Sequence, residues 1–292
     1  MKYQTFSIVS GTEICNSSCP FCVARQTGFI GVERKPTPIN ARNFIKATNL
    51  AYRTGTNTAI ITGKGEPTLY PDQITEYLQL MSYGRYDFPF IELQTNGIMI
   101  ANGKVSDSTL NLWYDLGLTT ILLSIVHFEP EINRKTYMPK AEKYLDIGAL
   151  VEKVQKIGIN VRLTCVGLDG FIDSSDKLIE LMKFAKNNGV KQVSWRPVNA
   201  PDKSEDPDVF EWTKNHFLKL HQKEEIHNYV IRHGTLIQNL VHGAQVYDLN
   251  GQNLCLSNCL TRNPNEETAR QLIFFPNGEL YTDWQFKGSL LL

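Results

Sequence analysis

The feature that most constrains this chain is a repeat in its hydrophobic pattern. Short apolar stretches rich in β-branched residues begin about every thirty residues, and segments with helical spacing of apolar residues lie between them. A βα unit has this length, so the repeat predicts an α/β fold built on a parallel sheet. The expected strands are residues 6–10, 58–62, 90–95, 119–126, 160–166 and 191–195.

The segments between these strands carry helix start and stop signals. Asn40, Ser106 and Ser174 favour helix N-termini, and glycines fall where several helices would end. A parallel sheet of this kind either stays open or curls toward a barrel, and in both cases the reactive loops follow the carboxyl ends of the strands. The expected helices are residues 40–54, 71–83, 106–116, 141–157, 174–188 and 205–224.

The repeat stops near residue 200. Residues 199–208 read as a polar loop, residues 225–250 favour neither helix nor strand, and residues 270–284 predict a hairpin that turns at Pro276, Asn277 and Gly278. We therefore expect a core domain over residues 1–200 and a C-terminal extension over residues 201–292 that caps the open side of the sheet.

The charge balance argues against polyanion binding. Lys plus Arg and Asp plus Glu both number 30, so no net field favours nucleic acid or an anionic membrane. The chain has 292 residues, of which 42% are hydrophobic, and it can bury a full core. The apolar run at residues 6–9 is too short for a signal peptide, and no segment approaches the ~18 apolar residues of a membrane span. These features predict a cytoplasmic, globular protein.

Three of the six cysteines crowd into one short run, as Cys15, Cys19 and Cys22. This clustering favours metal ligation in a reducing compartment over structural disulfides. Soft thiolates select iron–sulfur clusters or zinc. A four-iron cluster has four corners, so three cysteines in one loop would leave one iron open to another ligand.

The run from Cys15 to Cys22 resembles the signature of radical S-adenosylmethionine (SAM) enzymes. That signature is C-x3-C-x2-C with an aromatic residue before the last cysteine, here Phe21. The resemblance implies a partial (β/α)6 parallel barrel with a [4Fe-4S] cluster on Cys15, Cys19 and Cys22. It also implies backbone contacts to adenine around Phe21 and Val23.

Further family elements follow successive strands. The stretch Gly65-Glu66-Pro67 is similar to the family's Gly-Gly-Glu-Pro segment, in which a carboxylate and nearby backbone hold the amino group of SAM, although Lys64 replaces the usual first glycine. Thr95 and Asn96 follow the third strand and Ser124 ends the fourth. The resemblance implies that these polar residues lie near the ribose of the cofactor.

The remaining candidates concern the substrate and a second metal. His127 follows the fourth strand, Arg162 and Arg196 suit a carboxylate or phosphate, and Trp284 ends the hairpin. Each of these residues also suits a purely structural role. Cys255 and Cys259 are candidates for a second metal site, for redox or zinc roles, or for unliganded thiols.

The resemblance implies that an electron from the cluster cleaves SAM to a 5′-deoxyadenosyl radical, which removes a hydrogen atom from the substrate. An electron donor such as flavodoxin or ferredoxin would be needed. The substrate is either a small molecule, with a nucleotide derivative preferred, or a peptide or protein, including glycyl-radical activation. The alternative without catalysis is a zinc or iron–sulfur binding module completed by a distant cysteine.

Overall fold

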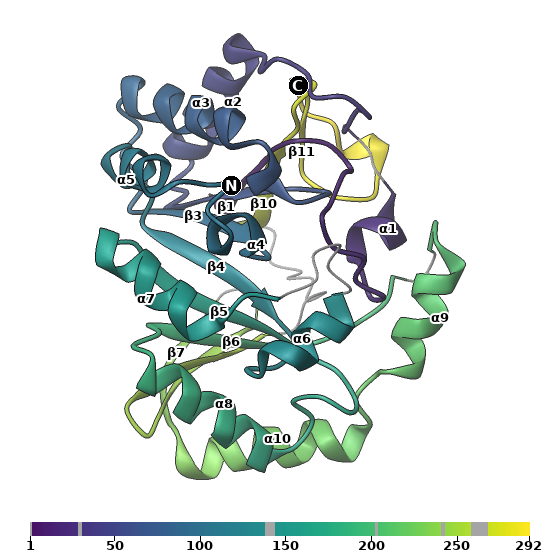
Figure 1. Cartoon of the computed structure of the whole chain (residues 1–292). Coiled ribbons are helices and arrows are strands. Elements are labelled where there is room, and N and C mark those ends of the chain that lie inside the picture. The colour runs from purple at the N-terminus through teal and green to yellow at the C-terminus, as the bar shows by residue number, and fades with distance from the viewer. Residues whose placement is uncertain (1, 29–30, 138–143, 202–203, 241–242, 258–267) are drawn as a thin grey trace.

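The computed structural model describes residues 2–28, 31–137, 144–201, 204–240, 243–257 and 268–292. Within these residues, every strand belongs to one eleven-stranded sheet in the order β11-β10-β1-β2-β3-β4-β5-β6-β9-β8-β7 (Figure 1). The strands are β1 (Lys2–Val9), β2 (Thr58–Thr62), β3 (Phe90–Thr95), β4 (Thr120–Ile125), β5 (Asn160–Gly167), β6 (Gln192–Pro197), β7 (Thr235–Asn239), β8 (Gln245–Leu249), β9 (Gln252–Leu256), β10 (Thr268–Phe274) and β11 (Leu280–Tyr281).

The strands from β10 through β1–β6 to β9 all run parallel, while β11, β8 and β7 run antiparallel to their neighbours. β9 and β10 follow each other in the chain, yet they lie at opposite ends of the parallel series. In a flat sheet these ends would be roughly 34 Å apart. Curling brings them closer together, and the sheet remains open with free edges at β7 and β11. This is the partial parallel barrel that the sequence predicts.

Helices lie on the outer face of the curled sheet (Figure 1). Several of the expected caps are present, since the side chains of Asn40, Ser106 and Ser174 accept hydrogen bonds from backbone N–H groups in the first turns of α2, α5 and α8. The helices are α1 (Val23–Thr27), α2 (Ala41–Arg53), α3 (Pro71–Tyr83), α4 (Ile98–Ala101), α5 (Asp107–Asp115), α6 (Pro130–Tyr137), α7 (Ile147–Ile157), α8 (Ser175–Asn187), α9 (Pro207–Asn215) and α10 (Leu220–His233).

The two faces of the sheet differ in polarity. Outward side chains such as Ile61, Leu93 and Leu163 are fully buried against the helices in the main hydrophobic core. The inward side chains on the same strands include Glu92 on β3 and Arg162 on β5, which form an ion pair inside the curl. The alternation of apolar and polar residues along β3 and β5 therefore departs from the continuous apolar runs expected for the strands.

The C-terminal extension differs in detail from the sequence prediction. Its described strands lengthen the sheet at both edges: β10 pairs with β1, and β9 pairs with β6. The hairpin is confirmed, because β10 and β11 are antiparallel and Gly278 N–H donates to Phe275 O across the turn. The helix expected over residues 205–224 is instead two helices, α9 and α10.

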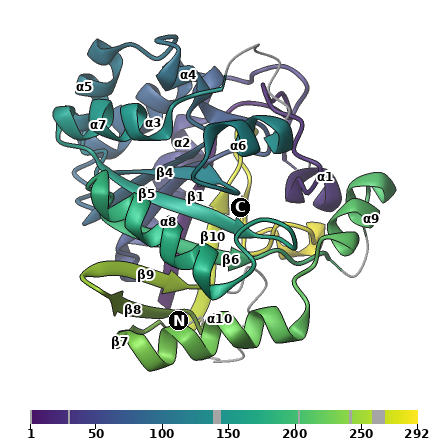
Figure 2. The same ribbon diagram turned by 60° about the horizontal axis from the view of Figure 1, so that its bottom comes forward.

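The last helix of the extension, α10, lies beside α8 on the outside of the molecule (Figure 2). Among the described residues, no helix combines the length and hydropathy needed to cross a bilayer.

Candidate active site

A large cavity of about 1340 Å³ opens at the carboxyl ends of the strands. The cysteine loop, the segments after β2 and β3, and the end of β4 line it, together with α1, the start of α9 and the C-terminal segment. Figure 1 shows α1, α9 and the C-terminal segment gathered on this side of the molecule. The sheet thus brings residues from distant parts of the sequence to one place, where the fold predicts reactive loops.

The three clustered cysteines all line this cavity. Burial raises the pKa of Cys15 to about 11 and that of Cys19 well above its ordinary value; Cys22 adds to both rises, and Cys15 adds to that of Cys19. Mutual repulsion of their thiolates requires that the sulfur atoms lie near one another. The Ser17 N–H donates a hydrogen bond to Cys15 Sγ at 3.4 Å, which favours the thiolate.

Neighbouring loops hold the cysteine loop in place. Asn96 Nδ2, after β3, donates to Asn16 Oδ1 at 2.7 Å and to Ser17 Oγ at 3.1 Å. On the opposite side, Ser18 N–H donates to Tyr137 O at 2.8 Å. Asn96 therefore connects the end of β3 to the loop that carries the thiols, a structural role that its position in the sequence alone did not reveal.

The glycine segment after β2 packs directly against the cysteine loop. Gly65 N–H donates to Thr12 O at 3.1 Å and Glu66 N–H donates to Ile14 O at 3.0 Å. A Cβ atom on Gly65 would lie 2.1 Å from Ile14 O, so this approach requires glycine. The requirement explains why the motif has glycine at this position.

The carboxylate of Glu66 is buried at the wall of the cavity. Its Oε1 accepts hydrogen bonds from Thr68 N–H and from the hydroxyls of Thr68 and Thr95, and its Oε2 accepts one from Asn96 N–H at 2.9 Å. Burial raises the pKa of Glu66, and these hydrogen bonds oppose the rise. Glu66 thereby connects the end of β2 to the end of β3. Among the described residues, its Oε2 accepts one hydrogen bond and its Oε1 accepts three.

Lys64 occupies the position at which this sequence departs from the Gly-Gly-Glu-Pro pattern. Its Nζ donates to Gly28 O at 2.9 Å and to Thr27 Oγ1 at 3.2 Å, and it lies 5.4 Å from the ring centroid of Trp284. Burial lowers the pKa of Lys64 to about 8, against the opposing influence of Cys22 and Asp283. The side chain joins the glycine segment to α1 and to the C-terminal segment.

The sequence of residues 9–195 matches the Radical SAM superfamily, and this match spans more than half of the chain. The chain belongs to the radical SAM superfamily. The resemblance inferred from the cysteine run is thereby confirmed at the level of the family. No curated protein sequence matches the chain.

Solved structures of radical SAM enzymes share the fold. SuiB of Streptococcus suis bound to the precursor peptide SuiA has a TM-score of 0.62 and 17% identity, and the alignment covers 99% of this chain and 61% of SuiB. For anSMEcpe with bound AdoMet the TM-score is 0.61 and the identity 12%, and the alignment covers 98% of this chain and 72% of that chain. For methylornithine synthase (PylB) the TM-score is 0.55 and the identity 11%, with coverage of 91% of this chain and 74% of that chain. This chain therefore spans about three fifths of SuiB.

The other residues expected at the cofactor are distributed around the same cavity. Thr95, Asn96, Ser124 and Val23 line it, and the Val23 side chain is exposed. Phe21 is held differently, because its ring packs edge-on against Tyr137 and at a tilt against Trp212. Its carbonyl accepts a hydrogen bond from Gln26 Nε2 at 3.4 Å.

The substrate candidates of this radical SAM protein occupy three different environments. The His127 ring stacks on Phe128 and accepts a hydrogen bond at Nδ1 from Glu129 N–H, outside the cavity lining. Trp284 packs against Phe275 beneath Lys64 Nζ. Arg162 and Arg196 belong to the inward face of the sheet, where Arg162 pairs with Glu92.

Of the second cysteine pair, only Cys255 lies within the described residues. Cys255 is buried on β9 near Arg162 and Arg196, whose charges act against the rise that burial causes in its pKa. Cys259 lies outside the described residues. Among the residues described, no three His, Cys, Asp or Glu side chains are placed to hold a single metal ion. A four-iron cluster makes a different demand, because each thiolate binds its own iron.

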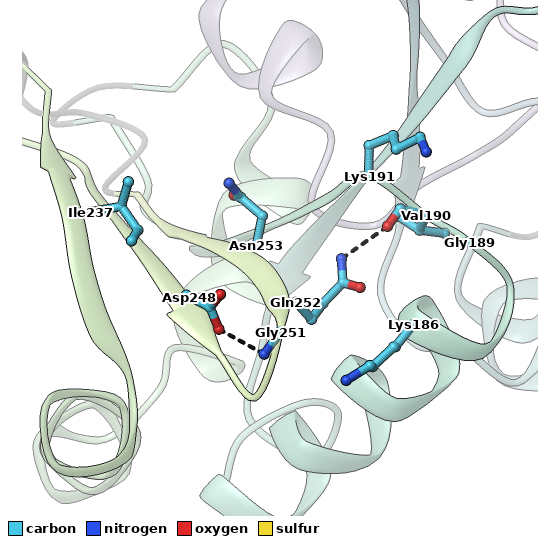
Figure 3. A pocket seen from close by; sticks show the side chains of 9 residues that line it. All are labelled: Lys186, Gly189, Val190, Lys191, Ile237, Asp248, Gly251, Gln252 and Asn253. Atoms are coloured by element: carbon cyan, nitrogen blue, oxygen red, sulfur yellow. Dashed lines mark hydrogen bonds between the residues drawn. The ribbon is translucent and has the colours of Figure 1, made fainter.

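A smaller cavity of about 450 Å³ lies at the other ends of the strands (Figure 3). Lys186, Lys191, Ile237 and Asp248 contribute to its lining, and Gln252 Nε2 donates to Val190 O inside it at 2.9 Å. None of the residues expected at the cofactor lines this cavity. The larger cavity is therefore the candidate active site.

Proposed function

We propose that the protein binds a [4Fe-4S] cluster through Cys15, Cys19 and Cys22 and uses it to cleave SAM reductively. The observation that carries this proposal is that the three thiols line one cavity together with Gly65 and Glu66. Among the described residues that line this cavity there is no other cysteine and no histidine. Such a donor set suits a cluster with one iron left to SAM.

The residues around the thiols fit the cofactors. A cluster is stabilised by backbone hydrogen bonds to its sulfur ligands, such as that of Ser17 N–H to Cys15 Sγ. The hydroxyl of Tyr137, whose ring packs with Cys19 and Phe21, is buried without a hydrogen-bond partner among the described residues. A buried hydroxyl without a hydrogen-bond partner is consistent with a site that a polar cofactor completes.

When bound, the cluster and SAM supply a 5′-deoxyadenosyl radical that removes a hydrogen atom from the substrate. The chain positions its cofactors and excludes water. Glu66 Oε2 and the close backbone at Gly65 would receive the ammonium of SAM, while Thr95, Asn96 and Ser124 would face its ribose. Residues 1–200 form the catalytic core in this proposal. Residues 201–292 complete its wall through Glu205, Asp206 and Gln285.

The substrate is an unidentified small molecule in this proposal, and an electron donor such as flavodoxin or ferredoxin supplies the electrons. A peptide substrate is the second candidate, favoured by the likeness of the fold to that of SuiB, whose structure contains a precursor peptide.

Anaerobic reconstitution with iron and sulfide tests the proposal. The wild-type protein should gain about four irons per chain and release 5′-deoxyadenosine from SAM under a strong reductant. Cys19→Ala should lose both properties. The matched control is Cys165→Ala, because Cys165 is buried on β5 in the main core and is not among the residues that line the cavity.

Two results would contradict the proposal. A Cys19→Ala protein that keeps the cluster and cleaves SAM would remove that ligand. A colourless wild-type protein that binds zinc and is inert to SAM would identify a binding module instead of an enzyme active site. Iron content of Cys255→Ala, measured alongside, tests whether that thiol helps to hold a second cluster.

A further inference from the structure

The inward face of the parallel strands β1 to β6 has an unbalanced charge. Its charged side chains among the described residues are Glu92, Arg162 and Arg196, which together carry one net positive charge. Arg162 makes a two-pronged pair with Glu92, with nitrogen–oxygen distances of 2.9 and 3.2 Å. Arg196 has no ion pair of this kind among the described residues, and its buried Nε has no hydrogen-bond partner.

The pairing of Arg162 with Glu92 shows which inward side chains on neighbouring strands lie at the same height in the curled sheet. Glu92 is in register with Thr120 on β4, and Thr120 with Asn160 on β5. The side chain that meets Glu92 nevertheless belongs to Arg162, two residues further along β5. Inward side chains at the same height in the barrel therefore lie about one residue further along each successive strand than the strand register indicates, as tilted barrel strands require.

The same offset places Arg196 level with residues that line the large cavity, although Arg196 is not itself among the described lining residues. Ser124 lines the cavity and is in register with Thr164, which is in register with Ser194 on β6. Two residues further along β6 is Arg196. Trp195 between them is buried in the outer core, so Ser194 and Arg196 both face inward. Arg196 thus lies level with Ser124, beneath the residues expected to hold the cofactor.

A partly buried guanidinium without an ion-pair partner is unfavourable unless something pairs with it. Its planar fork matches the two oxygens of a carboxylate, and a single available guanidinium balances the single charge of that group.

We propose that Arg196 binds a carboxylate of the substrate on the inward face of β6, level with the cavity lining. The inference rests on the proposed function, since it assigns the substrate to the space beneath SAM. The Arg162–Glu92 pair lies deeper in the interior and keeps Arg162 engaged, so Arg196 is the arginine that remains for the ligand among the described residues of this face. The carboxylate belongs either to a small acid or to an acidic side chain of a peptide.

Ligand-observed NMR with matched pairs tests this site directly. The probes are pentanoate against pentanamide, and acetyl-Ala-Glu-Ala-amide against acetyl-Ala-Gln-Ala-amide, in a buffer of low ionic strength without carboxylates. For at least one pair, the wild-type protein should bind the acid about tenfold more tightly than the amide. The pair that discriminates identifies whether a small acid or a peptide side chain supplies the carboxylate.

Arg196→Gln should abolish this discrimination, and Arg196→Lys, which keeps the charge but loses the fork, should reduce it. The control is Lys191→Met, which removes an exposed cation just before the same strand and should leave the discrimination unchanged. Circular dichroism verifies folding, and Arg196→Lys serves as the test if Arg196→Gln does not fold. Equal binding of acid and amide by the wild type, or discrimination that survives in a folded Arg196 variant, overturns the proposal.

The iron content and SAM cleavage of the wild-type protein are measured on the same preparation. They test the proposed function separately. Selective carboxylate binding in a protein that neither takes up iron nor cleaves SAM would preserve the anion site and remove the reaction. Iron uptake and SAM cleavage without selective carboxylate binding would preserve the proposed reaction and remove the anion site.

Discussion

The two faces of the same strands have different roles in this protein. On β3, Ile91 and Leu93 point outward into the core beneath the helices, while Glu92 and Gln94 point inward. Gln94 lines the cavity and accepts a hydrogen bond from Thr62 Oγ1 at 2.8 Å. The outer face stabilises the fold by burying apolar surface, and the inner face presents polar groups to a ligand. Adjacent residues of one strand should therefore respond very differently to substitution.

The largest difference is expected between Leu93 and Gln94. Leu93→Ala should lower the free energy of unfolding by about 3 kcal/mol, because it opens a cavity in a fully buried part of the core. Gln94→Ala should lower it by less than about 1 kcal/mol. Urea denaturation of both variants measures the contrast. Similar destabilisation by the two substitutions would show that the inner face is packed like the outer one.

The next largest effect concerns the ion pair on the inner face. Glu92→Gln should destabilise the protein by about 2 kcal/mol at neutral pH, because Arg162 would keep its charge without its partner. The double replacement Glu92→Leu with Arg162→Leu should recover most of that loss, since neither charge remains. Urea denaturation of the single and double variants checks both statements. A double variant less stable than Glu92→Gln would mean that the pair contributes net stability.

A smaller effect, which depends on pH, is expected at Lys64. Burial lowers its pKa from 10.5 in the unfolded chain to about 8 in the folded protein. Between these values the unfolded state binds more protons, so the contribution of Lys64 to stability rises with pH. Relative to wild type, Lys64→Met should therefore lose stability as pH rises above 8, by at most about 1.4 kcal/mol per pH unit.

Denaturation at pH 7, 8 and 9 measures the difference between the Lys64→Met variant and wild type at each pH. The exposed Lys46, changed to Met, is the matched control and should show a difference that does not vary with pH. A constant difference for Lys64→Met would contradict the lowered pKa.

Much of the core could be predicted from the sequence because its signals are local. The expected strands 58–62 and 90–95 agree with β2 and β3 to the residue, and Asn40, Ser106 and Ser174 cap the expected helices. The pairing of β10 with β1 could not be predicted, since it depends on contacts between segments about 265 residues apart. The break between α9 and α10 also lacks a glycine or proline to announce it.

The candidate site divides in a similar way. Spacing identified Cys15, Cys19 and Cys22, which line one cavity. The bracing of the loops could not be read from the sequence, because the roles of Asn96 and Glu66 depend on how far their side chains reach across strand ends. His127 fits the sequence pattern of a substrate residue, but its ring is engaged with Phe128 and Glu129. Its assignment as a substrate contact stays a prediction.

The position of β10 has a consequence for how the chain folds. β1 pairs on one side with β2, which follows within some sixty residues, and on the other side with β10, which is made about 265 residues later. Until then one edge of β1 has unpaired backbone groups, and such edges recruit other chains. The unpaired edge of β1 should therefore be the site at which the nascent chain aggregates, and the site that chaperones must shield until β10 pairs with it.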